Sequence, residues 1–231
     1  MDAPTLHNMI LKPLSTIMSA FIIVSTAHAN VPCNEKVSIA SAPVPPLVLD
    51  KENTLTGVLQ SSTETFLADH GLAPSWLIIN WARALHMAET GVVDALFPSL
   101  YSKEREAYLD YSLEPVSNVK VSLYQHALTQ QAPELARSSV ATLRSFEYST
   151  TELDDAKVYE VADFKQAIGM LEKRRVDFIF GVKEVLDYEI EQLGAEHVVE
   201  YKGVSIRPVY LALARNSPNY LRLKDCLGLH Q

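Results

Sequence analysis

The segment ALHMAETGVVDALF, residues 84–97, is followed 83 positions later by a similar segment, AIGMLEKRRVDFIF, residues 167–180. Six of the fourteen aligned positions are identical, and two more exchange leucine for isoleucine. In each segment apolar residues first recur at helical spacing and then alternate with a period of two, which predicts a helix followed directly by a buried strand. Asn80 and Asp163 stand just before the helical stretches, where a side-chain oxygen can cap free backbone N–H groups.

The repeat predicts two similar α/β halves, because a helix that leads straight into a strand is half of a parallel α/β unit. The alternative is a single α/β domain, in which helix–strand units recur without any duplication. The strand positions expected to be buried share a spacing of two, and they are Val93, Ala95 and Phe97 in the first copy and Val176, Phe178 and Phe180 in the second.

Composition and charge narrow the class of protein. The chain has 231 residues, of which 48% are hydrophobic and 21% charged, so it can form one large globular domain or two small ones. The net charge of −8 argues against a nucleic-acid partner, which requires a basic face.

The amino terminus has the features of an export signal. Lys12 precedes an apolar stretch, residues 14–24, that is too short to span a bilayer, and the tripeptide AHA that follows matches the small-x-small cleavage pattern. We therefore expect residues 1–29 to be a signal peptide, with its start at Met1 or at Met9. A buried N-terminal helix is the alternative.

The two cysteines lie near opposite ends of the exported chain. An oxidising compartment allows Cys33 to pair with Cys226, and closing so long a loop contributes about 5 kcal/mol in the chain-entropy model. The pairing requires both chain ends to meet in the same half of the molecule. Two unpaired cysteines are the alternative.

The remaining elements follow from periodicity and turn signals. Strands are expected over residues 36–42, 74–80, 116–127, 138–143, 156–161, 197–202 and 207–215. Helices are expected over residues 58–71 and 183–194, the second ending at a glycine, with a short terminal helix within 216–231.

A series of short motifs then resembles one protein family. The Pro45-Pro46 loop is followed by Leu55-Thr56-Gly57, by Gly91–Ala95, by Ser102–Arg105 and by Asp110–Ser112 with a proline three residues on. In order and spacing these motifs resemble the bacterial extracellular solute-binding proteins of family 3, the type II periplasmic binding proteins. The likeness covers nearly all of residues 36–218, and the helix start WARAL is similar to a subgroup with a Trp-x-Arg-Ala-Leu motif.

This resemblance implies an α/β fold with two lobes, each a mostly parallel sheet flanked by helices, joined by two crossing strands. We expect the first lobe to span residues 30–118, the second 119–207, and the chain to return to the first over 208–231 with a shortened terminal helix. The resemblance also implies a periplasmic location.

Two residues match ligand-binding positions of the family. Arg105 matches the arginine that holds a ligand carboxylate, and the guanidinium fork pairs with a carboxylate bidentately, which lysine cannot do. Ser102 matches a threonine whose hydroxyl also contacts the ligand. A solvated surface arginine and a simple helix cap are the respective alternatives.

Further candidates follow from their place at strand ends, because ligands of parallel α/β sheets bind beyond the carboxyl ends of the strands. Trp81 and Arg83 stand where a strand ends and a helix begins, so Trp81 is expected to wall the cleft and Arg83 to meet an anion near the helix N-terminus. Tyr101 is a similar candidate. Core packing for Trp81 and a surface position for Arg83 are the alternatives.

In the second half the loop RSFEYS is expected to face the cleft. Phe146 and Tyr148 can stack on a ligand, and Glu147 can meet an amine; ordinary packing or solvation is the alternative for each. Val182 stands where amino-acid-binding members carry an aspartate for the α-amino group. The ligand class therefore stays open between an amino acid and an organic acid.

No catalytic residue is expected, because the chain lacks the common nucleophile, zinc and phosphate-loop motifs. Asp94 and Asp177 recur in the two repeats, but each lies at the start of a strand, on the wrong edge for the cleft, so we interpret both as structural caps or turn acceptors. We expect no cofactor and no metal site.

The leading functional expectation is an exported, monomeric solute-binding protein. Its two lobes close on a small polar ligand by hinge motion, and its partner is an ABC permease or a membrane sensor. A ligand-sensing or interaction module with a degenerate cleft is one alternative. A dehydratase-like enzyme on the same scaffold, with Glu147 or a cleft aspartate as its acid–base candidate, is the other.

Overall fold

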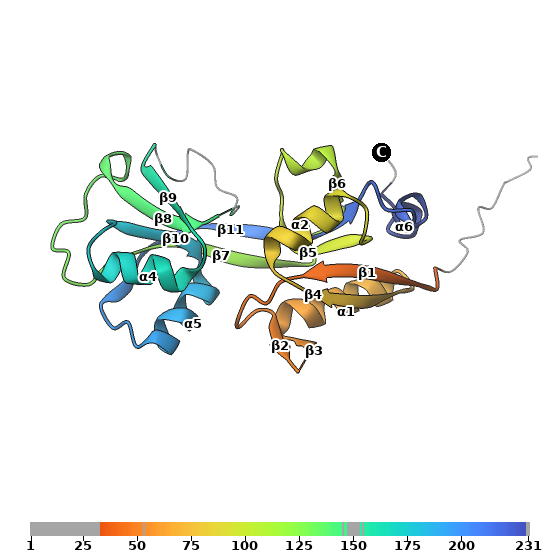
Figure 1. The fold of residues 1–231 in the computed structure, drawn as a ribbon, viewed down its shortest axis with the longest axis horizontal. Coiled ribbons are helices and arrows are strands. Elements are labelled where there is room, and N and C mark those ends of the chain that lie inside the picture. The colour runs from red at the N-terminus through yellow and green to blue at the C-terminus, as the bar shows by residue number, and fades with distance from the viewer. Residues whose placement is uncertain (1–32, 53, 145, 147–152, 154, 230–231) are drawn as a thin grey trace, which may run out of the picture. The chain divides into compact units, whose positions relative to one another are not determined.

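The computed structural model describes residues 33–52, 54–144, 146, 153 and 155–229, and these form a mixed α/β fold (Figure 1). The strands are β1 (Glu35–Ser41), β2 (Leu49–Lys51), β3 (Thr54–Thr56), β4 (Leu72–Ile78), β5 (Ala95–Leu100), β6 (Leu109–Tyr111), β7 (Ser117–His126), β8 (Ser139–Leu143), β9 (Lys157–Val161), β10 (Phe178–Val182) and β11 (Val198–Ala214). The helices are α1 (Val58–Asp69), α2 (Trp81–Glu89), η1 (Arg105–Ala107), η2 (Leu135–Arg137), α4 (Phe164–Glu172), α5 (Lys183–Leu193) and α6 (Tyr220–Cys226).

The large sheet consists of two halves with the same strand plan. In the first half β4, β1 and β5 are parallel neighbours, and in the second half β9, β8 and β10 are parallel neighbours in the corresponding order. In each half the strand that comes first in sequence, β1 or β8, lies in the middle of the three. The next, β4 or β9, lies at the edge of the sheet, and the last, β5 or β10, lies on the inner side. The inner strands β5 and β10 each pair antiparallel with one long strand, β11 and β7 respectively. The two similar halves that the repeat predicts are therefore confirmed.

The strands β7 and β11 form an antiparallel ribbon that joins the two halves (Figure 1). They pair from Val198–His126 in the second half to Val209–Ser117 in the first. Beyond this point β11 continues between β5 and β6, two strands of the first half.

The sequence pattern divides β11 incorrectly. Separate strands are expected over 197–202 and 207–215, but one strand runs through both, with bulges opposite β7. The intervening residues 203–206 are half-buried or exposed, and the apolar alternation is lost there. Pairing with β7 nevertheless continues and keeps the backbone extended. The predicted lobe boundaries 118/119 and 207/208 fall inside these strands and stay predictions.

The repeated segments have the same backbone conformation. Asn80 Oδ1 accepts the backbone N–H of Arg83 at 2.9 Å, and Asp163 Oδ1 accepts that of Gln166 at 2.7 Å, so both predicted caps are confirmed. Past each helix one residue takes the left-handed conformation at the equivalent position, with φ of 72° at the glycine of the first copy and 54° at Arg174 in the second.

Each of the two repeated aspartates accepts hydrogen bonds from a serine on the strand that lies next to β5 or β10 in the sheet. Asp94 Oδ2 accepts the backbone N–H and the hydroxyl of Ser38 at 2.9 and 2.7 Å, and Asp177 Oδ2 accepts the same two groups of Ser139 at 2.8 and 2.6 Å. Each aspartate N–H in turn contacts the serine hydroxyl oxygen at 3.0 Å. Both carboxylates therefore fix the start of a strand, as the structural interpretation predicts.

The core lies between the parallel strands and the helices that connect them. The six strand positions of the repeat that we expect to be buried are at most 4% exposed. Full burial of such side chains contributes about 1.5–3 kcal/mol each for the large apolar ones. The repeat is thus the part of the sequence that both defines the halves and fills their interiors.

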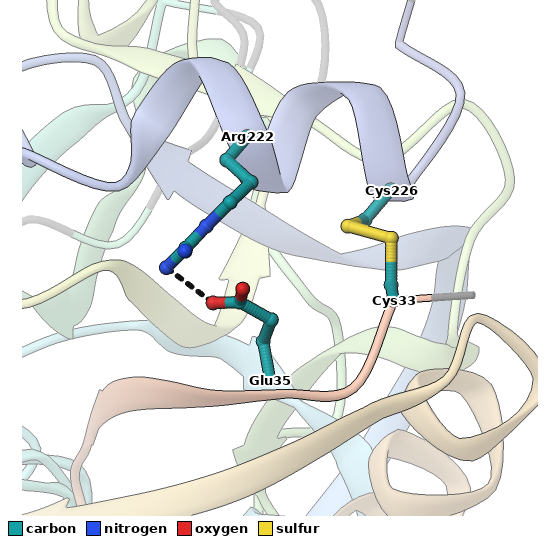
Figure 2. Close-up of a disulfide and its surroundings, with 4 residues drawn as sticks. All are labelled: Cys33, Glu35, Arg222 and Cys226. Carbon is teal, nitrogen blue, oxygen red and sulfur yellow. Dashed lines mark ion pairs between the residues drawn. A yellow bond between two sulfur atoms is a disulfide. The ribbon is translucent and has the colours of Figure 1, made fainter. Parts of the chain in front are cut away.

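A disulfide joins Cys33 to Cys226, with 5.8 Å between their Cα atoms, and it ties the entry to β1 to the end of α6 (Figure 2). Arg222 on α6 also forms an ion pair with Glu35 on β1 (Figure 2). The pairing of the two cysteines is therefore confirmed, and the described chain ends meet in the first half of the molecule.

None of the helices among the described residues is long and apolar enough to cross a membrane. The predicted signal peptide, residues 1–29, lies outside the described residues.

Candidate functional site

The carboxyl ends of the parallel strands in the two halves face each other along the β7–β11 ribbon. β5 ends at Leu100, which pairs with Val209 of β11, and β10 ends at Val182, which pairs with Val121 opposite Ser205 of β11. Four residues of extended strand separate these two points on β11, a distance of about 14 Å. Because ligands of such sheets bind beyond the carboxyl ends, this stretch of the ribbon is the candidate functional site.

Arg105 is the cation of the site on the first half. It lies in η1, in the segment that follows β5, and only 7% of the residue is exposed, which excludes a solvated surface arginine. Its guanidinium carbon lies 5.8 Å from the ring centroid of Trp81, the first residue of α2. A cation at this distance over an indole ring gains about 0.5–2 kcal/mol, and the ring also fixes the plane of the fork. Two residues singled out by sequence are thus in contact.

Ser102 and Tyr101 differ in their surroundings. Ser102 is buried, its backbone N–H lies 3.1 Å from the hydroxyl oxygen of Tyr111, and its own hydroxyl has no hydrogen-bond partner among the described residues. Tyr101 is exposed, and its hydroxyl donates to Glu106 at 2.8 Å. This hydrogen bond raises the pKa of the Tyr101 phenol. Tyr101 therefore points at Glu106 in a different pocket, whose lining contains neither Trp81 nor Arg105.

Arg83 lies in the first turn of α2 and its residue is exposed. Only its backbone N–H takes part in the cap formed by Asn80. The structure therefore brings Arg83 to the correct strand end, two residues from Trp81, but does not bury it as it buries Arg105.

On the second half, Phe146 follows β8 and is half-buried. Its ring packs against that of Phe180 at 5.8 Å, and the guanidinium carbon of Arg207 lies 5.8 Å from Phe146 and 6.0 Å from Phe180. Arg207 comes from β11, within the stretch that separates the two sets of strand ends. Glu147 and Tyr148 lie outside the described residues.

The start of α5 contributes two charged residues of different character. Lys183 Nζ donates to Asp187 at 2.9 Å and to Glu200 at 2.8 Å, which raises the pKa of its ammonium group. Lys183 is therefore committed to holding α5 against β11. Glu184 differs, because its Oε2 atom is buried and has no hydrogen-bond partner in the described part of the chain.

Buried polar atoms without partners gather at these strand ends. Six side-chain atoms of this kind occur among the described residues, and four of them belong to Ser41 at the end of β1, Ser102 beyond β5, Thr142 near the end of β8 and Glu184 beyond β10. Buried polar groups are normally hydrogen-bonded, so water or a ligand is the expected partner of these four atoms.

The sequence analysis missed Arg207 and Glu184. Arg207 stands in an otherwise apolar strand, IRPVYLALA, and this placement is the one local sign that it serves a purpose beyond solvation. Glu184 gives no local signal, since glutamate is common in the first turn of a helix. No group of three or more potential metal ligands occurs within the part of the chain that the structure describes.

No protein-family model and no curated protein sequence matches the chain. Solved structures do. A histidine kinase sensor domain with similarity to periplasmic binding proteins has a TM-score of 0.68 at 16% identity, over 85% of this chain and 90% of that one. The GluR0 ligand-binding core in complex with L-glutamate has a TM-score of 0.65 at 18% identity, over 84% and 91%. The arginine-bound form of truncated ArgBP from T. maritima has a TM-score of 0.64 at 15% identity, over 84% and 92%.

These similarities establish the fold. The chain has the two-lobed architecture of the type II periplasmic binding proteins, and its two sheet halves, together with the flanking helices, are the two lobes.

Proposed function

We propose that this chain is an exported solute-binding protein whose two lobes close on a small polar ligand that carries a carboxylate. Arg105 holds the carboxylate, and Trp81 orients the guanidinium group and walls the cleft. The observation that carries the proposal is the buried position of Arg105 over Trp81, at the carboxyl end of β5. The guanidinium fork matches a carboxylate bidentately, which makes an arginine at a strand end a suitable carboxylate anchor.

The remaining contacts come from both lobes. Ser102 is the proposed hydroxyl contact of the first lobe, and Arg83 is proposed at its rim. On the second lobe Phe146 is the proposed stacking contact, and Glu147 and Tyr148, which lie outside the described residues, stay proposed contacts. Glu184 joins them as the acceptor for a ligand amine, because its buried Oε2 atom has no hydrogen-bond partner among the described residues.

The proposed motion is a hinge at the β7–β11 ribbon. These two strands are the elements that pass between the sheet halves, and the stretch of β11 between the strand ends belongs to neither core. Small backbone changes there reorient one lobe against the other without repacking either interior. Binding and closure need no chemistry, so we propose no catalytic role.

Two outlets fit such a protein. Import through an ABC permease in the periplasm is the first, and signalling through a membrane sensor is the second. The second is favoured by one observation, the similarity to a histidine kinase sensor domain over 85% of this chain. Neighbouring permease and ATPase genes would support import, and a neighbouring histidine kinase or cyclase gene would support signalling.

Calorimetric titration of the mature chain tests the ligand proposal. The panel contains amino acids, mono- and dicarboxylates and amines without a carboxylate. We expect binding to be restricted to carboxylates, to weaken about 100-fold in Arg105→Gln, and to weaken about tenfold in Arg105→Lys, which keeps the charge but loses the fork.

The matched control is Arg137→Gln. Arg137 lies in η2 before β8, at the opposite edge of the second sheet half, and its side chain is 83% exposed. Its substitution should leave every affinity unchanged. Equal weakening in the two glutamine variants, or no binding to any carboxylate in the panel, would remove the proposal.

A further inference from the structure

The first lobe contains a second pocket of about 420 Å³, separate from the cluster around Arg105. Its lining comes from the segment after β5, from η1, β6 and α6, and from the end of β11. Neither Trp81 nor Arg105 belongs to it. The volume lies within the range of about 300–1,000 Å³ that small-molecule pockets usually have.

The centre of the pocket wall is a satisfied carboxylate. Asp110 accepts hydrogen bonds from Arg215 and from the hydroxyl of Tyr220, and Lys224 Nζ lies 3.6 Å from its Oδ2 atom. Burial raises the pKa of Asp110, but the bonds from Tyr220 and Arg215 outweigh burial and lower it. Asp110 is therefore a fixed anion whose role is to hold Arg215 and α6 in place.

Two other charged side chains that line the pocket, Glu106 and Arg215, have hydrogen-bonding positions that the described bonds do not use. Glu106 accepts from Lys103 at 2.6 Å and from Tyr101 at 2.8 Å, and these bonds lower its pKa and keep it ionised. A carboxylate offers about four acceptor positions and a guanidinium group five donors, so the described hydrogen bonds use only part of Glu106 and of Arg215. Their side chains are 36% and 43% exposed, and no ion pair among the described residues joins one to the other.

The same pocket has an exposed apolar wall. Leu113 is 64% exposed and Tyr101 is 47% exposed, and both line the cavity. Large apolar side chains are unfavourable in water, and here they stand beside a pair of opposite charges. A ligand that matches this surface therefore has one anionic group, one cationic group and an apolar body.

We propose that this pocket binds a small zwitterion with an apolar side chain, the class to which free apolar amino acids belong. The ammonium group contacts Glu106, the carboxylate contacts Arg215, and the side chain packs against Tyr101 and Leu113. This site goes beyond the proposed function, because it uses neither Arg105 nor the second lobe.

Three probes that share a phenylethyl group test the charge requirement. L-Phenylalanine carries both charges, 3-phenylpropanoate lacks the ammonium group, and 2-phenylethylamine lacks the carboxylate. Titrations of the isotope-labelled mature chain are followed by NMR at the amides of Tyr101, Asp110, Leu113 and Arg215, with L-leucine as a second zwitterion. We expect shifts at these amides with both zwitterions, and at least tenfold weaker binding of the two singly charged probes.

Variants then separate this pocket from the carboxylate anchor. Glu106→Gln keeps an acceptor for Tyr101, and Leu113→Lys changes an exposed rim residue, so neither disturbs the core; each should weaken zwitterion binding at least fivefold. Arg105→Gln should leave the zwitterion-induced shifts of the pocket amides unchanged. The assignment is wrong if neither zwitterion shifts the pocket amides at millimolar concentration, if the singly charged probes bind as well, or if Arg105→Gln abolishes the shifts. A loss of calorimetric carboxylate binding that occurs only in Arg105→Gln bears on the proposed function and not on this pocket.

Discussion

The two copies of the repeated segment have the same backbone but different surroundings. In the second copy Asp177 is exposed, and the hydrogen bonds described for its carboxylate come from Ser139. In the first copy Asp94 is 6% exposed, and its Oδ1 atom also accepts the hydroxyl of Ser217 at 2.6 Å and the side-chain amide of Asn219 at 3.0 Å. The difference comes from the returning carboxyl-terminal segment, which packs on the first copy.

The same contrast holds at the left-handed turn. A Cβ atom at Gly91 would lie 2.1 Å from the carbonyl oxygen of Asn216, whereas Arg174, the equivalent residue of the second copy, has its side chain exposed. The comparison shows that similar local sequences give similar local structure, while the neighbouring segments determine which substitutions each copy tolerates.

Removing the disulfide should have the largest effect, because it attaches the carboxyl-terminal segment to the first lobe. Closing a loop of 193 residues contributes about 5 kcal/mol to the free energy of unfolding in the chain-entropy model. We expect the Cys33→Ser/Cys226→Ser variant to lose about that amount in chemical denaturation. Its amide hydrogen exchange should accelerate in β1 and α6 and stay unchanged in α4 and β10. Equal acceleration in both lobes would contradict the comparison.

Alanine at the left-handed turn should separate the two copies next. Gly91→Ala places a Cβ atom against the Asn216 carbonyl in a strained backbone region, and we expect a loss of about 4 kcal/mol of unfolding free energy. Arg174→Ala is the matched control, since it also leaves alanine at the left-handed position but meets no backbone atom that arginine does not already meet. It should change stability by less than about 0.5 kcal/mol. Similar losses in both variants would show that backbone strain alone, without the contact to the Asn216 carbonyl, determines the loss of stability.

Replacing the repeated aspartates by asparagine should give a smaller difference in stability between the two copies. Asp94→Asn replaces a buried carboxylate that accepts four described hydrogen bonds and should cost about 3 kcal/mol. Asp177→Asn affects two exposed hydrogen bonds from Ser139 and should cost about 1 kcal/mol of unfolding free energy. Thermal unfolding of both variants at neutral pH measures the difference, and equal costs would mean that the contacts from Ser217 and Asn219 contribute nothing.

Acid should reduce the difference in stability between the wild type and Asp94→Asn. Burial raises the pKa of Asp94, but the hydrogen bonds from Ser217, Ser38 and Asn219 outweigh burial and lower it below the ordinary value of 3.8. The unfolded chain then takes up the proton first, so the stabilisation is complete above the ordinary pKa and is lost as the pH falls through the lowered one. The stability gap between the wild type and Asp94→Asn should therefore narrow below about pH 4. A gap that is constant down to about pH 2.5 would contradict this.

Much of the fold was predictable from the sequence because it depends on neighbours along the chain. The caps at Asn80 and Asp163, the turn at Gly91 and the alternation of buried residues are all set within one or two helical turns. The single strand β11 was not predictable, because its middle stays extended through pairing with β7 rather than through its own apolar pattern.

The candidate site was predictable in part. Trp81 and Arg105 were identified at strand ends, and the structure brings them into contact. Arg207 was missed, because its aromatic partners lie 27 and 61 residues away in the sequence. The second pocket was missed for the same reason, since Glu106 and Arg215 come together through the pairing of β6 with β11.

The sequence by itself determined that this chain contains two equivalent α/β halves, where their helices begin and which of their residues are buried. Those features follow from hydrogen bonds and periodic burial over short spans. Only the tertiary structure decided that the two cysteines pair, that Arg105 is buried, and that one aspartate of the repeat is enclosed while the other faces water. Such outcomes depend on strand register and on segments that are distant in the sequence, so no local pattern contains them.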